Sequence, residues 1–267
     1  MLGSVSYPGF ELADDFSLAL NILSSSISKL GYECERSDSS WQDLIPPKLS
    51  FLKLFQLTYY HTKFQSEIST LNLKNLTKIQ VFLKVVLRLA KDLTVLSKKE
   101  FEKKHLKHFV LNQYITDKHL STIGRFLNSQ SKYLLVCEND IVLNESPTTF
   151  LDEVFDIAEA HNGALFINVS NNSSFSKVSD HFGGKEKNYS GSKVWKEIDF
   201  FVNGTAFYFI NREMGARIYN FVVCRPTYRN CSVDWLFSLI GRKSKKTEVT
   251  CLIPSKVYVS NGSRSKC

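Results

Sequence analysis

The sequence predicts an α/β fold in which a mostly parallel sheet is flanked by helices. The chain has 267 residues, 43% of them hydrophobic, which is enough to bury a sizeable core. In its second half, helical patterns alternate with short strands, as in folds built around a parallel sheet. These strands are apolar along their whole length, as strands buried on both faces are. We expect a single domain over residues 1–267.

The first half of the chain predicts few elements before a long basic region. A helical pattern over residues 14–30 stops at Gly31, and a short strand follows at 32–36. The pair Pro46-Pro47 then breaks the chain. Residues 41–110, rich in Lys and largely helical in pattern, are predicted to be an insertion into the domain.

The second half predicts three strands, each paired with a helical segment. The expected order is helix 116–129, strand 132–137, helix 146–161, strand 164–169, strand 205–210 and a helix from Asn211. A polar loop rich in Ser, Gly and Lys separates the second strand from the third.

The net charge of +8 is concentrated in the insertion. Between Lys74 and His108 there are ten Lys and Arg against three Asp and Glu, a net of +7. Apolar residues recur there at helical spacing, with basic residues Lys84, Arg88 and Lys91 towards another face. Such a helix suits an anionic membrane surface, or else packs on its own domain with a solvated face. Nucleic acid is not expected, because aromatic residues do not alternate with the basic ones.

The amino terminus and the cysteines predict a cytoplasmic protein. The basic helix adds the expectation that the protein is peripheral on the inner face of the plasma membrane. The amino terminus has no basic and apolar segments of the kind found in secretory signals. The six cysteines lack the spacings of zinc sites and are expected to be free thiols, with a Cys224–Cys231 pair as the alternative.

The segment 133–143, YLLVCENDIVL, places two carboxylates at the end of an apolar strand. Carboxylates persist at such positions when they are paired, hydrogen-bonded or bound to a metal. Ligand sites of α/β sheets lie beyond the carboxyl ends of strands, and residues two apart on an extended chain point the same way. Glu138 and Asp140 are therefore candidate ligands for Mn²⁺ or Mg²⁺ with a diphosphate, and an acidic turn that caps the next helix is the alternative.

Five motifs occur in order between residues 116 and 265. They are DKHL with His119, LLVCENDIVL, NGTAFYFINREMGA with Gly204, CSVDWLF with Asp234, and PSKVYVSNGSRS from Pro254. In this order the motifs resemble glycosyltransferase family 25, the bacterial lipopolysaccharide and lipooligosaccharide transferases of the GT-A fold. The family has an acid in the middle of its EDD motif, where this sequence has Asn139.

The resemblance implies a GT-A-like, Rossmann-like fold and a metal-dependent hexosyltransferase. The reaction would move a hexose, galactose in many members, from a UDP-sugar to a glycan or glycolipid such as lipopolysaccharide, with inversion. Asp140 and Glu138 would hold the Mn²⁺ or Mg²⁺, and Asp234 would be the general base for the acceptor hydroxyl. The resemblance also implies donor contacts by His119, Asn139, Gly204 and Thr205, and acceptor contacts by Tyr208 and Trp235.

Each of these roles has a structural alternative. Asp234 follows Ser232 and Val233 in a pattern that also suits a helix N-cap, and a lone helical His119 also suits a buried structural role. Tyr208 and Trp235 also suit core packing. Two other functions stay open: a non-catalytic membrane-surface protein of the same fold, and a metal-dependent phosphohydrolase.

Overall fold

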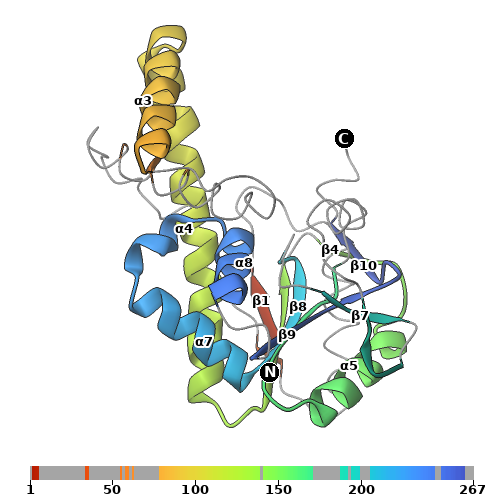
Figure 1. Cartoon of the computed structure of the whole chain (residues 1–267). Helices are drawn as coiled ribbons and strands as arrows, with labels where there is room; N and C mark the ends of the chain where they lie inside the picture. Colours follow the sequence, from red (N-terminus) through yellow and green to blue (C-terminus); the bar gives the residue numbers. More distant parts are fainter. Residues whose placement is uncertain are drawn as a thin grey trace.

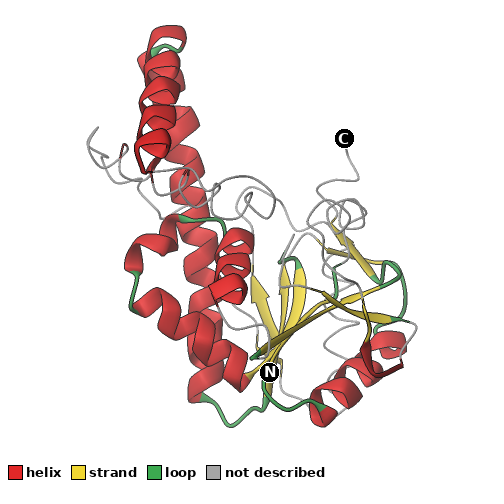
Figure 2. Cartoon of the chain, in the orientation of Figure 1, coloured by secondary structure: helices red, strands yellow, loops and turns green. Residues whose placement is uncertain are grey.

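The computed structural model describes residues 2–5, 34–35, 55, 58–59, 62, 78–138, 141–170, 187–191, 194–198, 205–243 and 248–261. They form a mixed α/β fold in which a twisted sheet has helices on both sides (Figure 1; Figure 2). The helices are α3 (Lys78–Val95), α4 (Lys98–Asn128), α5 (Thr148–Ala160), α7 (Arg212–Val223) and α8 (Val233–Lys243), with 3₁₀ turns η1 (Tyr189–Gly191) and η2 (Pro226–Asn230).

Eight of the described strands form one sheet. In spatial order they are β2 (Cys34–Glu35), β1 (Leu2–Val5), β3 (Tyr133–Glu138), β8 (Phe207–Asn211), β5 (Ala164–Asn168), β9 (Val249–Pro254), β7 (Trp195–Ile198) and β6 (Lys187–Asn188). A separate antiparallel pair joins β4 (Ile141–Leu143) to β10 (Val259–Asn261).

The large sheet is mixed, and most of its neighbouring strands are antiparallel, so the predicted mostly parallel sheet is wrong. Strand β1 is parallel to β2 and β3, and β5 is parallel to β9. The other four pairs are antiparallel: β3–β8, β8–β5, β9–β7 and β7–β6. The main departure is β8, which runs in reverse between β3 and β5.

Alternate residues of the central strands bury against opposite layers. In β3, Leu134 and Val136 face α4, α7 and α8, while Leu135 and Cys137 face α5. The same alternation holds in β5 and β8, because successive side chains on a strand point to opposite faces. This burial on both faces explains the continuous apolar runs of the sequence, and it confirms the expected cover of helices on both faces.

Helices α4 and α7 pack closely on the side of the sheet that carries α8. At Gly215 of α7, an added Cβ would lie 3.3 Å from Cε1 of Phe126 on α4, so the contact depends on the missing side chain. Arg212, at the start of α7, donates to the carbonyls of Phe126, Leu127, Ser129 and Ser131 at the end of α4. These bonds join the start of α7 to the last turn of α4 and to the residues that follow it.

The helical part of the predicted insertion forms a hairpin of α3 and the first half of α4, which extends away from the sheet (Figure 1). A capping box at Ser97 starts α4: the Ser97 hydroxyl accepts from the Glu100 amide, and the Glu100 carboxylate accepts from the Ser97 amide. Helix α4 continues without a break through residue 110, where the insertion was expected to end.

The predicted helix at 14–30 and the break at Pro46-Pro47 lie outside the described residues. Cysteines 137, 224, 231 and 251 are free thiols. In the part of the chain that the structure describes, no helix has the length and apolar character needed to cross a membrane.

Candidate functional site

The candidate site lies at the carboxyl end of β3, beside the carboxyl end of β1. Glu138, the last residue of β3, pairs in register with Val5, the last residue of β1. The chain passes from β1 to β2 on one side and later returns to β3 on the other. Such a change of direction between parallel strands is where open α/β sheets bind their ligands. The sequence therefore placed Glu138 correctly at a strand end, and the topology makes that edge of the sheet a candidate binding site.

A buried histidine connects α4 to Glu138. His119 is fully buried, its Nε2 lies 3.2 Å from Oε1 of Glu138, and its Nδ1 lies 2.9 Å from the hydroxyl of Tyr208 on β8. Burial, together with the negative charge of Glu138, raises the pKa of Tyr208 well above its ordinary value, so this phenol keeps its proton. With the imidazole proton on Nε2, that nitrogen donates to Glu138 and Nδ1 accepts from the Tyr208 hydroxyl.

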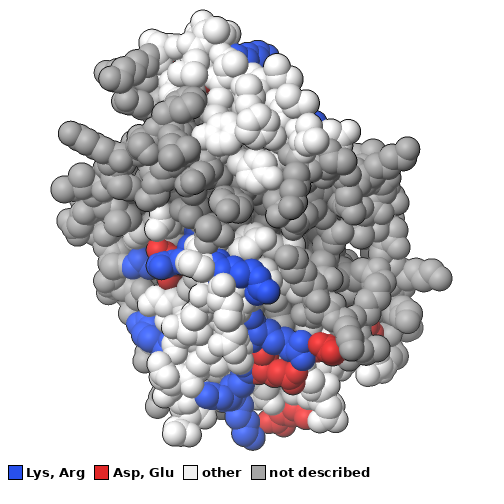
Figure 3. All heavy atoms as spheres, turned by 60° about the vertical axis from the view of Figure 1, so that its left-hand side comes forward, with Lys and Arg blue, Asp and Glu red and all other residues white. Residues whose placement is uncertain are grey.

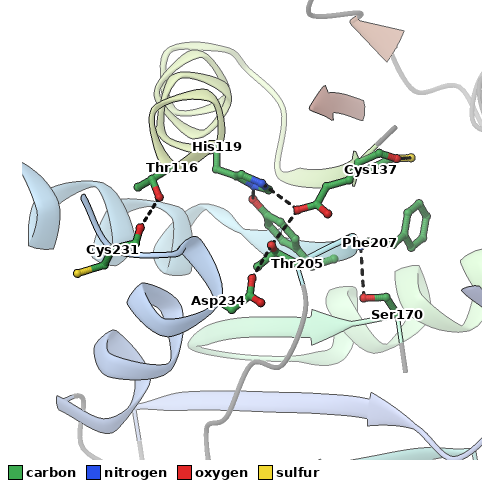
Figure 4. A network of polar contacts seen from close by, with 10 residues as sticks. Thr116, His119, Cys137, Ser170, Thr205, Phe207, Cys231 and Asp234 are labelled. Atoms are coloured by element: carbon green, nitrogen blue, oxygen red, sulfur yellow. Dashed lines mark hydrogen bonds and ion pairs between the residues drawn. The ribbon is translucent and has the colours of Figure 1, made fainter. Parts of the chain in front are cut away.

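A second residue joins Glu138 to the predicted base. The hydroxyl of Thr205, just before β8, lies 2.9 Å from Oε1 of Glu138 and 2.9 Å from Oδ1 of Asp234. Figure 4 shows the side chains of His119, Thr205 and Asp234 converging from three separate segments. Two carboxylates from β3 and α8 are thus linked through one hydroxyl.

Asp234 is held at this place by the start of α8. It is the second residue of that helix and not the residue before it, so its carboxylate is not the N-cap that the sequence allowed as an alternative. It is in the first turn, where the helix macrodipole favours a negative charge. The hydroxyl of Thr116 on α4 donates to the carbonyl of Cys231, three residues before Asp234, at 2.7 Å. Helix α4 therefore positions both His119 and the approach to α8.

Thr116 is a site-supporting residue that the sequence analysis missed. It precedes His119 by three residues, so the two side chains lie on the same face of α4. That spacing is the signal that would have found it, although its partner at Cys231 is 115 residues away in sequence.

Of the residues predicted for the site, the structure joins His119, Glu138, Thr205, Tyr208 and Asp234 in one connected network. His119 and Tyr208 are fully buried within it: His119 contacts Glu138 directly, and Tyr208 contacts His119. Trp235 is half-buried and packs beside Cys231 and Leu239, outside the network. Asn139, Asp140 and Gly204 lie outside the described residues.

The donor atoms at the site are of the kind that hard divalent cations prefer. Among the described residues there is no group of three or more His, Cys, Asp and Glu side chains that could hold a metal ion. The network nevertheless brings two carboxylates together through Thr205, and Asp140 follows Glu138 by two residues in the sequence. Carboxylate oxygens with substrate phosphates are the usual ligands of Mg²⁺ and Mn²⁺.

Comparison of the sequence with models of known protein families and with curated proteins found no match.

Proposed function

We propose that this protein is a metal-dependent glycosyltransferase that moves a hexose, galactose in the first instance, from a UDP-sugar to a glycan or glycolipid acceptor with inversion. One observation supports the proposal most. The carboxylate of Asp234 is tied through Thr205 to Glu138, at the point where the strand order reverses. A GT-A-like fold is part of this proposal.

In this proposal Asp234 acts as the general base. An acceptor hydroxyl is a weak nucleophile at neutral pH, and a carboxylate within hydrogen-bond reach removes its proton as it attacks the anomeric carbon. Asp234 is only half-buried, so an acceptor can approach it, whereas Glu138 is buried. Thr205 holds the Asp234 carboxylate in one orientation through the single hydrogen that its hydroxyl donates to Asp234 or shares with Glu138.

Asp140, supported by Glu138, is proposed to hold Mn²⁺ or Mg²⁺ against the donor diphosphate. When bound, the metal would supply positive charge that offsets the charge developing on UDP. Glu138 is itself fixed by His119 and Thr205, so its part is to set the direction of the strand end that leads to Asp140. We propose a cytoplasmic location, in which the described free thiols stay reduced.

The test is an assay of UDP release from a panel of UDP-sugars, with and without Mn²⁺. We expect release that depends on the metal, and we expect EDTA to weaken UDP binding. Asp140→Ala should abolish both effects and Glu138→Ala should reduce them less. Asp152→Ala, on the exposed side of α5, is the matched control and should behave as the unmodified protein does. UDP binding that EDTA leaves unchanged would exclude the metal site.

A further inference from the structure

Helix α3 exposes an apolar stripe, in which Phe82 also contacts the ring of Phe55, with the two ring centroids 5.5 Å apart. The exposed fractions are Ile79 71%, Phe82 48%, Leu83 52%, Val86 38%, Leu87 68% and Leu93 50%. The apolar side chains that α3 buries are different ones, Val81, Val85 and Leu89, and the last two form a cluster with Phe101 of α4. The apolar face expected from the sequence is therefore not the one that attaches α3 to the protein.

The residues of α3 divide into three sectors around the helix axis. At about 100° per residue, the buried side chains occupy one sector and the apolar stripe a second. The third sector holds Lys84, Arg88 and Lys91, all exposed. The single acid of α3, Asp92, is turned into the buried sector. Every exposed charge on α3 is thus positive and lies beside the stripe.

The surface view shows where the charged side chains lie on this side of the molecule (Figure 3). Figure 3 turns the helical side of the molecule forward, and the region at the top, where Figure 1 places α3, is mainly white with blue Lys and Arg atoms at its edges. The contiguous red and blue pairs lie lower, over the body of the molecule. Apolar and basic groups without exposed acids are the composition of helices that lie in the interface of a membrane.

Charge decides between a bilayer and a second copy of the chain as the occupant. Residues 74–108 have a net charge of +7, so two copies facing each other through α3 would bring like charges together. An anionic bilayer instead offers negative headgroups to Lys84, Arg88 and Lys91 and an apolar layer to the stripe. A solvated helix would leave seven large apolar side chains of α3 in water, the six of the stripe and Val95.

We propose that this face of α3 docks on an anionic lipid bilayer, with Ile79, Leu83 and Leu87 inserted and Lys84, Arg88 and Lys91 at the headgroups. The face lies at the far end of α4 from the candidate site, since Phe101 and His119 are separated by about 27 Å along the helix axis. The proposal is independent of the proposed function, because neither Glu138 nor Asp234 takes part in it.

The experiment is flotation of the full chain with vesicles of phosphatidylcholine alone or mixed with phosphatidylserine. We expect binding to the anionic vesicles that weakens steeply as salt is raised. Replacing Lys84, Arg88 and Lys91 by Gln should weaken binding on the order of 100-fold, about fivefold for each charge. Ile79→Gln, Leu83→Gln and Leu87→Gln together should abolish it, and Gln keeps a good helix propensity.

Two matched sets of substitutions serve as controls. Gln at Lys118, Arg125 and Lys132 removes the same charge from another surface, and Gln at Val142, Val223 and Val257 removes exposed apolar groups elsewhere. Both sets should keep full binding. Equal recovery with neutral and anionic vesicles, or equal losses in the control sets, would overturn the proposal. A concentration-dependent dimer that the stripe substitutions dissociate, with no vesicle binding, would assign the face to a second copy.

Discussion

At the scale of single residues, the Thr205 hydroxyl is the atom on which the candidate site depends. It lies within hydrogen-bond distance of both Glu138 and Asp234, yet it has one hydrogen to donate. Thr205 therefore donates to one carboxylate at a time or shares its hydrogen between them. The orientation of Asp234 is thereby coupled to that of Glu138, and through Glu138 to His119.

Asp234→Asn separates the chemical role of this side chain from its structural one. Asn keeps the size of the side chain and an oxygen that accepts from Thr205, but it cannot take up a proton. We expect turnover to fall by about 10²–10⁴-fold with donor binding retained, since positioned proton transfer contributes about that much. The measurements are UDP release at saturating donor and UDP affinity by calorimetry.

The matched control for this variant is Asp156→Asn, on the exposed side of α5. Thermal unfolding of both variants checks that they fold. If the Asp234→Asn protein folds and transfers the hexose at a near-normal rate, Asp234 is not the general base and has only a structural role.

At the scale of elements, Asn211 joins three segments at the junction of β8 and α7. Its Oδ1 accepts from the amide of Met214 as the N-cap of α7 and also from the amide of Leu165 at the start of β5. Its Nδ2 donates to the carbonyl of Gly163 at 2.6 Å. One side chain thus starts α7 and fixes the register of β8 against β5.

Asn211→Ala should lower the free energy of unfolding by about 2–3 kcal/mol, because it removes a helix cap and two further bonds to the backbone. Asn211→Asp keeps the acceptor for Met214 and Leu165 but loses the donor to Gly163, so we expect about half that loss. Urea denaturation of the unmodified protein and of the two variants measures the order of their free energies of unfolding. Equal stabilities for the Ala and Asp variants would show that the accepted bonds contribute nothing.

The elements of the second half could be predicted from the sequence, but their directions could not. Strands β3, β5 and β8 read as apolar runs because each is buried on both faces, and such a run looks the same whichever way the strand points. Between β5 and β8 the described residues form β6, η1 and β7, and the sequence of that stretch has no helical pattern that would predict a parallel crossover. The predicted helix boundaries differ most at α4, which begins 18 residues before the predicted start at 116.

The site was predictable residue by residue but not as a network. Glu138 is placed by its strand end, and Asp234 by its helix start, both of which are local features of the sequence. The contact of His119 with Glu138 depends on how α4 is rotated against the sheet. The bridge through Thr205 depends on the reversed strand β8. Neither of these relations is contained in a local pattern.

At the scale of the whole molecule, α4 is the element that connects the two proposed surfaces. Its 31 residues extend over about 46 Å. The second half, with Ile115, Ile123 and Phe126, is buried against the sheet and bears His119. The first residues, with Phe101, pack against α3 instead. The same continuous helix, α4, therefore supports both the candidate site and α3.

That division of α4 has a consequence for hydrogen exchange. In α3, three of its apolar side chains are buried, and they face a small cluster separate from the main core, so we expect its amides to exchange through local openings well below the global free energy of unfolding. Amides of residues 115–127 should exchange only through global unfolding. Native-state hydrogen exchange in low denaturant, measured by mass spectrometry, distinguishes local opening from global unfolding. Equal protection of α3 and of residues 115–127 would show that the hairpin and the sheet unfold as one cooperative unit. With unequal protection, α3 can unfold and refold on a lipid surface while the network of His119, Glu138 and Asp234 stays intact.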